Sequence, residues 1–419
     1  MKIIYLHQYF NTLEMSGGTR SYEMARRLVA AGHDVQMITS SRVLDGRSTE
    51  WFTTTENGIN VHWLPVPYSN HMSYRDRIIA FIRFAFLAMA KAKELDGDVV
   101  FATSTPLTIA IPAVLAIRKK NIPLVFEVRD LWPELPVAMK ALRNPVLIWL
   151  AKKLELWAYR NSEAIIALSP GMKDGIVKSG YPAERVAIIP NGSDNFEFTY
   201  DRQAAAQFRA QREWLQDRPL LVYTGTFGRI NGVGFMVALA KEMLTINSDI
   251  RILLVGDGQE KAEITQQAEQ AGVLHVNLFI EASLPKKDIP ALLSAANMAS
   301  SLFIDLPEMQ SNSANKFFDA LASGTPVLLN YGGWQHELLL AKQCGLSIWR
   351  MPIDEAAKEV VSRITDKAWM EGAGRAAREL AEAVFDRDKL AAQFGGVISV
   401  AASRRGQGAA EIAPGNYHD

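Results

Sequence analysis

The chain has 419 residues, of which 48% are hydrophobic and 21% charged, so it can bury substantial cores and is long enough for two domains. The 45 Lys and Arg balance the 45 Asp and Glu, which excludes a global basic field and argues against a nucleic-acid partner. Cys344 is the only cysteine, so a disulfide framework within the chain and a multi-cysteine metal site are both excluded. A single cysteine suits a reducing compartment, and the opening MKIIYLHQYF lacks the apolar run of a secretory signal, so we expect a cytoplasmic protein.

In the N-terminal half, short β-rich apolar runs alternate with segments of helical period. The first helix is predicted at 20–31, and strands are predicted at 2–6, 35–39, 99–102, 124–128 and 164–168. This alternation predicts a parallel sheet covered by helices on both faces.

After Pro190-Asn191-Gly192 the chain is polar, and the strand pattern then restarts. The new strands are predicted at 220–223, 251–255, 276–279, 299–303 and 327–329. We therefore expect an α/β protein with two facing Rossmann-like domains, 1–195 and 196–385, and an active site in the cleft between them. A last helix at about 386–402, interrupted at Gly395-Gly396, would cross back to the first domain, and the Gly-rich tail 404–419 would be disordered.

The segment 311–327, SNSANKFFDALASGTPV, reads as a loop with capping residues, a helix, a turn and a strand. Open backbone N–H groups at Asn315, Lys316 and Phe317, together with the helix dipole, suit a diphosphate, and Lys316 adds a full charge. Asp319 lies one turn into the helix, where a carboxylate can accept both hydroxyls of a ribose. The alternative for Asp319 is a simple acidic residue in the first turn.

Another candidate phosphate-binding element is the Gly-rich loop within 220–243, which connects a strand to a helix. Gly228 would let the backbone approach a phosphate, and Arg229 would be the phosphate cation. Further along the chain, Lys286 and Lys287 are interpreted as solvated helix charges.

The N-terminal half offers two candidate ligand-binding positions. The Gly17-Gly18 turn would bring backbone close to the transferred sugar or phosphate, and Arg20 would reach phosphate or acceptor unless it is a surface residue. Asp130, at the end of a strand, can accept the proton of an acceptor hydroxyl. Arg129 would hold phosphate or orient Asp130, and an internal salt bridge is the alternative.

Taken together, these segments resemble the retaining glycosyltransferases of the GT-B fold, and among them the GT4 family. That family has two glutamates separated by seven residues, followed by a small-residue helix and Gly-x-Pro-Val; here Asp319 matches the second glutamate and Ser311 occupies the first position. The resemblance implies a UDP-sugar donor and a ribose role for Asp319. It also implies that Asp257, in the Gly-Asp-Gly at a strand end, lies near the base and ribose; the alternative is that Asp257 is a turn residue. The resemblance also implies retention at the anomeric carbon.

No Asp-x-Asp follows a strand, since its one instance, Asp386 to Asp388, opens the last helix, so we expect no obligatory metal and no other cofactor. The charge of the leaving diphosphate would then be stabilised by Arg229, Lys316 and helix N-termini.

Three short motifs narrow the resemblance to bacterial transferases of O-antigen and capsule assembly, particularly L-fucosamine transferases. They are Arg-Asp-Leu-Trp-Pro from Arg129, Asn-Gly-Ser-Asp from Asn191, and Asn-Lys-x-Phe-Asp from Asn315. This resemblance implies UDP-N-acetyl-L-fucosamine as donor and a polyprenyl-diphosphate-linked N-acetylhexosamine as acceptor.

Two helices, predicted at 75–93 and 139–160, mix basic and aromatic residues in a way that suits the inner face of an anionic membrane. The alternative is that they are partly buried helices covering the sheet. Two other functions remain open: a non-hydrolysing UDP-sugar epimerase, and an inactive nucleotide-sugar-binding partner, which the serine at 311 would suit.

Overall fold

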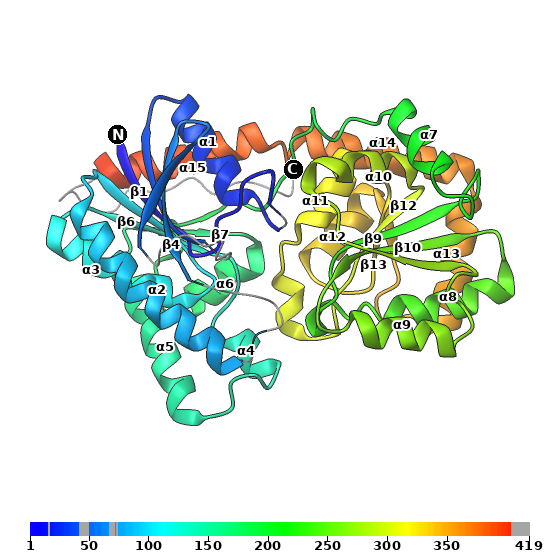
Figure 1. Ribbon diagram of the computed structural model, residues 1–419, viewed down its shortest axis with the longest axis horizontal. Helices are drawn as coiled ribbons and strands as arrows, with labels where there is room; N and C mark the ends of the chain where they lie inside the picture. Colours follow the sequence, from blue (N-terminus) through cyan, green and yellow to red (C-terminus); the bar gives the residue numbers. More distant parts are fainter. Residues whose placement is uncertain (16, 42–49, 67–71, 73, 404–419) are drawn as a thin grey trace. The chain divides into compact units, whose positions relative to one another are not determined.

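The computed structural model describes residues 1–15, 17–41, 50–66, 72 and 74–403 (Figure 1). The chain divides into two compact units. The first contains Met1–Thr12, Gly18–Pro190 and the described chain from Asp388 onward, and the second contains Leu13–Gly17 and Asn191–Arg387. The tail predicted to be disordered, 404–419, lies outside the described residues.

The first unit is built on an eight-stranded sheet in the order β3-β4-β2-β1-β5-β6-β7-β8. All neighbouring strands are parallel except β3 and β4. The strands are β1 Lys2–Leu6, β2 Asp34–Ser41, β3 Phe52–Glu56, β4 Ile59–Pro65, β5 Val99–Thr103, β6 Leu124–Val128, β7 Ala164–Ala167 and β8 Val186–Ile188.

The antiparallel β3–β4 hairpin was not predicted from the sequence. Its turn is Asn57-Gly58, with φ of 47° and 81°. Positive φ at both central residues is what a two-residue hairpin turn needs, and Asn-Gly is a strong signal for it.

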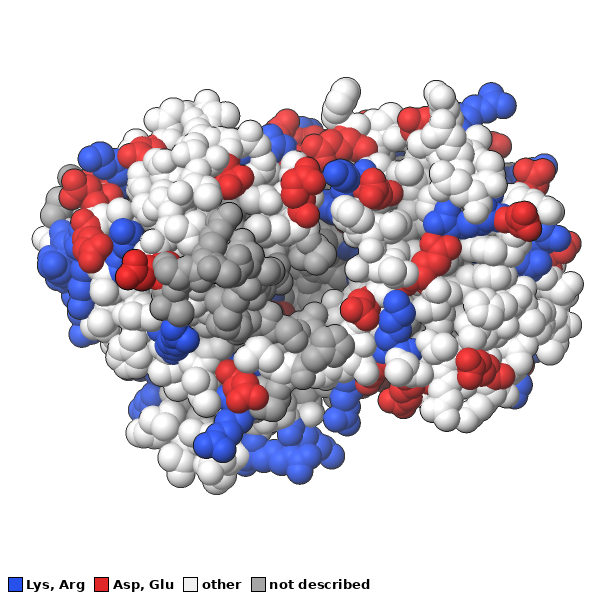
Figure 2. Space-filling model, viewed as in Figure 1, with Lys and Arg blue, Asp and Glu red and all other residues white. Residues whose placement is uncertain are grey.

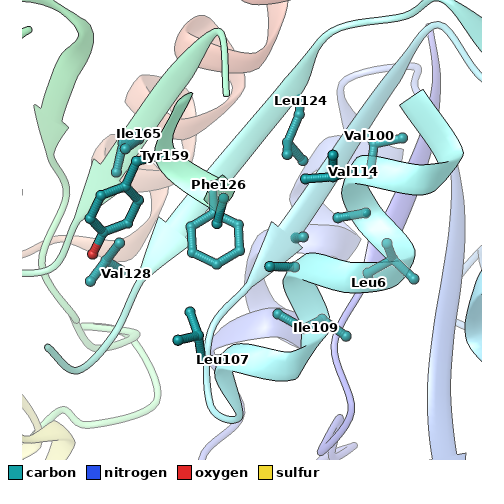
Figure 3. Packing of buried hydrophobic residues seen from close by; sticks show 14 of the residues in the cluster. Leu6, Val100, Leu107, Ile109, Val114, Leu124, Phe126, Val128, Tyr159 and Ile165 are labelled. Atoms are coloured by element: carbon teal, nitrogen blue, oxygen red, sulfur yellow. The ribbon is translucent and has the colours of Figure 1, made fainter. Parts of the chain in front are cut away.

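Helices cover this sheet, and their apolar residues pack on strands that are buried along their length. The helices are α1 Arg20–Ala30, α2 Tyr74–Glu94, α3 Ala110–Lys120, α4 Glu134–Ala138, α5 Pro145–Arg160, α6 Pro170–Lys178 and α15 Arg387–Ser403. Figure 3 shows Val100 of β5 and Leu124 of β6 beside Val114 of α3. Because β5 and β6 are buried at every position, their sequences are apolar except at Thr103 and Glu127 and do not alternate.

The last helix, α15, runs without a break through Gly395-Gly396, so the predicted interruption is wrong. Phe394 of α15 is fully buried and packs edge-on against Phe101 of β5, with ring centroids 4.7 Å apart. This packing holds the helix straight where the two glycines alone would weaken it.

The second unit is built on a six-stranded parallel sheet in the order β11-β10-β9-β12-β13-β14. The strands are β9 Leu220–Thr226, β10 Arg251–Asp257, β11 Leu278–Glu281, β12 Met298–Ser301, β13 Val327–Leu329 and β14 Gly345–Ser347. Its helices are α7 Arg202–Ala210, α8 Phe235–Ile246, α9 Lys261–Gln270, α10 Ile289–Ala295, α11 Asn315–Ala322, α12 Trp334–Lys342, α13 Ile353–Thr365 and α14 Lys367–Ala383. The predicted fold class, two α/β units with parallel sheets, is confirmed.

Candidate functional site

In the second unit, the chain order of the sheet reverses between the adjacent strands β9 and β12. Ligands of open α/β sheets bind outside the carboxyl ends of strands at such a point. The loop after β9 contains the short 3₁₀ helix η3, Arg229–Asn231, and the loop after β12 contains another, η5, Pro307–Ser311, before α11 begins. The predicted donor residues therefore gather where a ligand site is expected.

Helix α11 begins at Asn315 with no side-chain cap, because its N-cap residue is Ala314. Within the described chain, the backbone N–H groups of Asn315 and Lys316 make no hydrogen bond. The Phe317 N–H is different: it donates to the Ala314 carbonyl at 3.1 Å, so the prediction of an open donor there is wrong, and the Phe317 side chain is buried. Two open N–H groups at the positive end of a helix are suited to binding an anion.

The Lys316 side chain lies against the end of β9. Its Nζ donates to the hydroxyl of Tyr223 at 3.0 Å and lies 4.2 Å from the centre of that ring. Gly225 makes room for it, since a Cβ there would lie 2.9 Å from Nζ, and the φ of Gly225 is +145°. Burial lowers the pKa of Lys316 to about 7. The amine is thus poorly solvated, and an anion beside it would favour its charged form.

In the loop after β9, Arg229 is exposed and makes no hydrogen bond or ion pair within the described residues. Gly228 has a φ of −117° and room for a Cβ, whose nearest neighbour would be 3.5 Å away, so glycine is not required there by conformation. Glycine is required instead at position 258, where φ is +152° and an added Cβ would lie 2.5 Å from the Phe227 carbonyl oxygen. Asp257, just before it, ends β10 with its side chain exposed.

Asp319 lies in the second turn of α11 and is buried. Its Oδ1 accepts a hydrogen bond from Ser193 Oγ at 2.9 Å, and its Oδ2 forms an ion pair with Lys286 Nζ. The interpretation of Lys286 as a solvated charge is therefore wrong: its side chain is 18% exposed, and its ammonium lies 4.7 Å from the centre of the Phe198 ring. A carboxylate removed from water is stabilised by such a cation.

Ser311, which occupies the family's first glutamate position, is the last residue of η5. A 3₁₀ helix has three residues per turn, so Glu308 lies on the same face one turn earlier. The Oε2 atom of Glu308 is buried and has no hydrogen-bond partner in the described residues. A carboxylate is thus present one turn away from the position where the family pattern has one.

In the first unit, the loops after three adjacent strands meet around Arg129 and Asp130, which follow β6. Asp130 Oδ2 accepts from Thr105 Oγ1 at 3.0 Å, and the Arg129 guanidinium lies 3.4 Å from His7 Nε2. Burial raises the pKa of Asp130, although the Thr105 hydrogen bond and the Arg129 charge lower it. No ion pair within 4 Å joins Arg129 to Asp130 in this part of the chain, so the alternative of a salt bridge is not what the structure shows.

The prediction that Arg20 reaches a ligand is wrong, and so is its surface alternative. The guanidinium lies 2.8 Å from Glu127 in a pair whose side chains are 2% and 0% exposed, and it also donates to the carbonyls of Ile189 and Pro190. The hydroxyl of Thr103 donates a hydrogen bond to the other carboxylate oxygen, Glu127 Oε2, at 2.7 Å. Arg20 is thus a structural residue that ties α1 to β6 and to the end of the first unit.

The predicted Gly17-Gly18 turn precedes α1, and Gly17 has a φ of 129°. The carbonyl of Gly18 accepts from Asn11 Nδ2 at 3.2 Å. Helix α1 then starts after Thr19, whose side chain makes no cap hydrogen bond. Glycine suits position 17 because residues with a side chain rarely adopt this φ.

Helices α2 and α5 both pack on α3 and each has one buried and one exposed apolar face. The exposed residues are Ile79, Ile82, Phe86 and Leu87 on α2, and Val146, Leu147, Trp149 and Leu150 on α5, each 39–62% exposed. Figure 2 shows Lys and Arg side chains gathered at the lower end of this unit, where α4 and α5 lie in Figure 1. Lys153 Nζ lies 5.6 Å from the Trp149 ring.

Within the described ranges, no three His, Cys, Asp or Glu side chains come close enough together to hold a metal ion. No helix in the part of the chain that the structure covers combines the length and hydrophobicity needed to cross a bilayer.

Known proteins resemble the chain in sequence and in fold. Residues 17–192 match the family described as "Glycosyl transferase 4-like domain". The alpha-D-kanosaminyltransferase of Streptomyces kanamyceticus is 26% identical over 151 residues, which cover 36% of this chain. The chain spans about two fifths of the length of the curated relatives it matches, 39% in this case.

Solved structures resemble nearly the whole chain. Anabaena HepE in complex with UDP-glucose superimposes with a TM-score of 0.73 at 17% identity, covering 96% of this chain and all of that one. WaaG, a glycosyltransferase involved in lipopolysaccharide biosynthesis, superimposes with a TM-score of 0.69 at 17% identity, covering 95% and 99%. Residues 17–192 are thus similar to a glycosyl transferase 4-like domain, and the chain has the two-unit α/β fold, GT-B, of these solved structures.

Proposed function

We propose that this protein is a glycosyltransferase that moves a sugar from a UDP-sugar to a polyprenyl-diphosphate-linked sugar in the synthesis of a bacterial surface polysaccharide. The observation that carries the proposal is the uncapped start of α11, where two open N–H groups and the amine of Lys316 stand at the carboxyl end of β9. The HepE structure contains UDP-glucose in the same fold, which supports a UDP-sugar as the donor.

The donor diphosphate is proposed to lie on this helix start, with Arg229 and Lys316 as its cations. Arg229 is exposed and makes no hydrogen bond or ion pair among the described residues, and its charge acts on the nearby Glu260 carboxylate, so it can also act on a bound anion. Because these groups can stabilise the leaving diphosphate by themselves, the proposed reaction is independent of a metal and of any cofactor. Retention at the anomeric carbon is proposed from the GT4 resemblance.

On the acceptor side, Asp130 is proposed as the general base. Burial raises the pKa of its carboxyl group, and a base works best when its pKa approaches the working pH. Arg129 would bind an acceptor phosphate, since its guanidinium stands beside Asp130 without an ion pair to it among the described residues.

The acceptor is proposed to be lipid-linked because of the apolar and basic surface of α2 and α5. Several large apolar side chains on those helices are more than half exposed, including Phe86 at 56% and Trp149 at 57%. Apolar residues bordered by Lys and Arg suit the surface of an anionic bilayer, and we place the protein at the inner face of the cytoplasmic membrane. The motifs beginning at Arg129, Asn191 and Asn315 support N-acetyl-L-fucosamine as the sugar.

A transfer assay with purified protein tests this function. UDP-N-acetyl-L-fucosamine is incubated with a polyprenyl-diphosphate N-acetylhexosamine, with and without EDTA, and the lipid product is measured. Transfer should survive EDTA, and Lys316→Met and Asp130→Asn should each lower it at least 100-fold, whereas Lys287→Met, at an exposed lysine, should leave it unchanged.

Two results would overturn the proposal. Conversion of the UDP-sugar into its epimer without any acceptor would indicate an epimerase. Donor binding with no turnover of any UDP- or GDP-sugar, with each acceptor tested, would indicate an inactive binding partner.

A further inference from the structure

The ion pair between Lys286 and Asp319 lies beside the proposed diphosphate site and joins residues that are 33 positions apart in the chain. Both oxygens of Asp319 are engaged, Oδ1 by Ser193 and Oδ2 by Lys286. The lysine is the more accessible partner, since its side chain is 18% exposed against 9% for the aspartate. A ligand approaching Asp319 would therefore meet the ammonium group as well as the carboxylate.

The remaining bonding capacity of this pair is specific. An ammonium group has three N–H donors, and Lys286 uses one on Asp319 and makes no other hydrogen bond in the described residues. The Phe198 ring lies 4.7 Å from Nζ, and two of the three N–H donors have no hydrogen-bond acceptor among the described residues. A carboxylate can accept about four hydrogen bonds, and two are formed here.

The location of the pair is also informative. Asp319 lies four residues after Asn315, about 6 Å further along the axis of α11 at 1.5 Å per residue. If the phosphates of a nucleotide sugar rest on the start of α11, its ribose, and not the sugar to be transferred, would lie at this distance. The pair then faces a vicinal diol, and each hydroxyl of a diol can donate one hydrogen bond and accept another.

We propose that Lys286 and Asp319 act together to recognise the ribose of the donor, the aspartate accepting from its hydroxyls and the lysine donating to them. Lys286 is then a specificity-determining residue that favours ribonucleotides over deoxyribonucleotides. This inference depends on the proposed donor site and adds Lys286, a positively charged residue, to the ribose contact of Asp319.

The test compares the binding of UDP and 2′-deoxy-UDP by titration calorimetry, with GDP and 2′-deoxy-GDP used in the same way if guanosine binds better. The wild-type protein should prefer the ribonucleotide by about tenfold or more, as expected for hydrogen bonds to charged groups. In Lys286→Met the preference should fall to within about twofold, through loss of UDP affinity, with the 2′-deoxy-UDP affinity changing much less. Lys287→Met, at the neighbouring exposed lysine, should retain the full preference.

Removing Lys286 alone leaves Asp319 buried without its cation and can destabilise the fold. The double variant Lys286→Met/Asp319→Asn removes both charges and should also lose the preference, with its melting temperature recorded beside each titration. A preference unchanged in Lys286→Met would overturn the role of Lys286 while leaving the donor site standing, whatever the double variant does. If the wild-type protein binds none of the four nucleotides, the proposed donor site itself is wrong.

Discussion

Asp130 makes the pH dependence of the proposed reaction a test of its role. Burial raises its pKa, so the base should lose activity on acidification at a higher pH than an ordinary carboxylate would. The Thr105 hydrogen bond lowers that pKa, so Thr105→Val should move the acid limb of kcat/KM to still higher pH. A pH–rate profile of the two proteins would show the shift, and an acid limb that stays in place would argue against Asp130 as the base.

The low pKa of Lys316 predicts that the protein takes up a proton when the diphosphate binds. With a pKa of about 7 in the free protein, the amine is mostly neutral at pH 8 and must be protonated to pair with a phosphate. UDP affinity should therefore fall by up to about tenfold per pH unit above 7. Calorimetry in buffers of different ionisation enthalpy measures the uptake, which should vanish in Lys316→Met.

The low pKa of Lys316 makes the stability of the fold depend on pH in the opposite sense from a lysine held in a salt bridge. In the unfolded chain the lysine keeps its ordinary pKa of 10.5, so between 7 and 10.5 the unfolded state binds more protons. This group therefore makes stability rise with pH across that window.

Arg20 is expected to matter for stability and not for chemistry. Replacing it by Met leaves Glu127 charged and buried without its partner, which should lower the free energy of unfolding by about 3–5 kcal/mol. Denaturant unfolding of the first unit measures this. Arg363→Ala breaks a more exposed pair with Glu359 and should have little effect.

Residues whose role depends on distant partners are the ones that the sequence did not reveal. Asp319 and Lys316 could be found because a helix start and its first turns are local features. Lys286 could not, because its partner is 33 residues away and a lysine in a polar segment looks solvated. Glu127 did leave a signal, since a charge inside the apolar run LVFEV must be paired when that strand is buried.

At the scale of elements, α2 and α5 provide a test of membrane attachment. Replacing Ile82, Phe86 and Trp149 by Ser removes exposed apolar surface, and each side chain would contribute roughly 1.5–3 kcal/mol if fully buried in the bilayer. Co-sedimentation with vesicles of phosphatidylglycerol and phosphatidylethanolamine should fall at least tenfold. Leu340→Ser removes a similarly exposed residue from the second unit and serves as the matched control.

Most strands were predictable because a parallel sheet buried on both faces makes each strand a short apolar run. The edge strand β3 was missed because FTTTE is partly exposed and carries no such run. Strand β4, INVHWLP, is almost entirely buried, but polar Asn60 and His62 interrupt its apolar residues. Helix α15 was predicted to break at Gly395-Gly396, because helix propensity alone does not account for the packing of Phe394.

At the scale of the whole molecule, each unit has its own hydrophobic core, so unfolding need not be a single transition. A nucleotide that binds only the second unit should raise the transition of that unit alone, by about 2.7 kcal/mol at a concentration of 100 times Kd. Scanning calorimetry with Arg20→Met, which weakens the first unit, identifies which transition is which. A nucleotide that raises both transitions equally would contradict binding confined to residues 191–387.

The position of α15 has a consequence for synthesis on the ribosome. The core of the first unit includes Phe394, which packs against Tyr5 and Phe101, although about two hundred residues of the second unit are translated in between. The second unit, almost continuous in sequence, can therefore fold during translation, while the first waits for the last helix with part of its sheet uncovered. A nascent chain stalled before α15 would present that apolar surface to chaperones, so the unit translated first would be completed last.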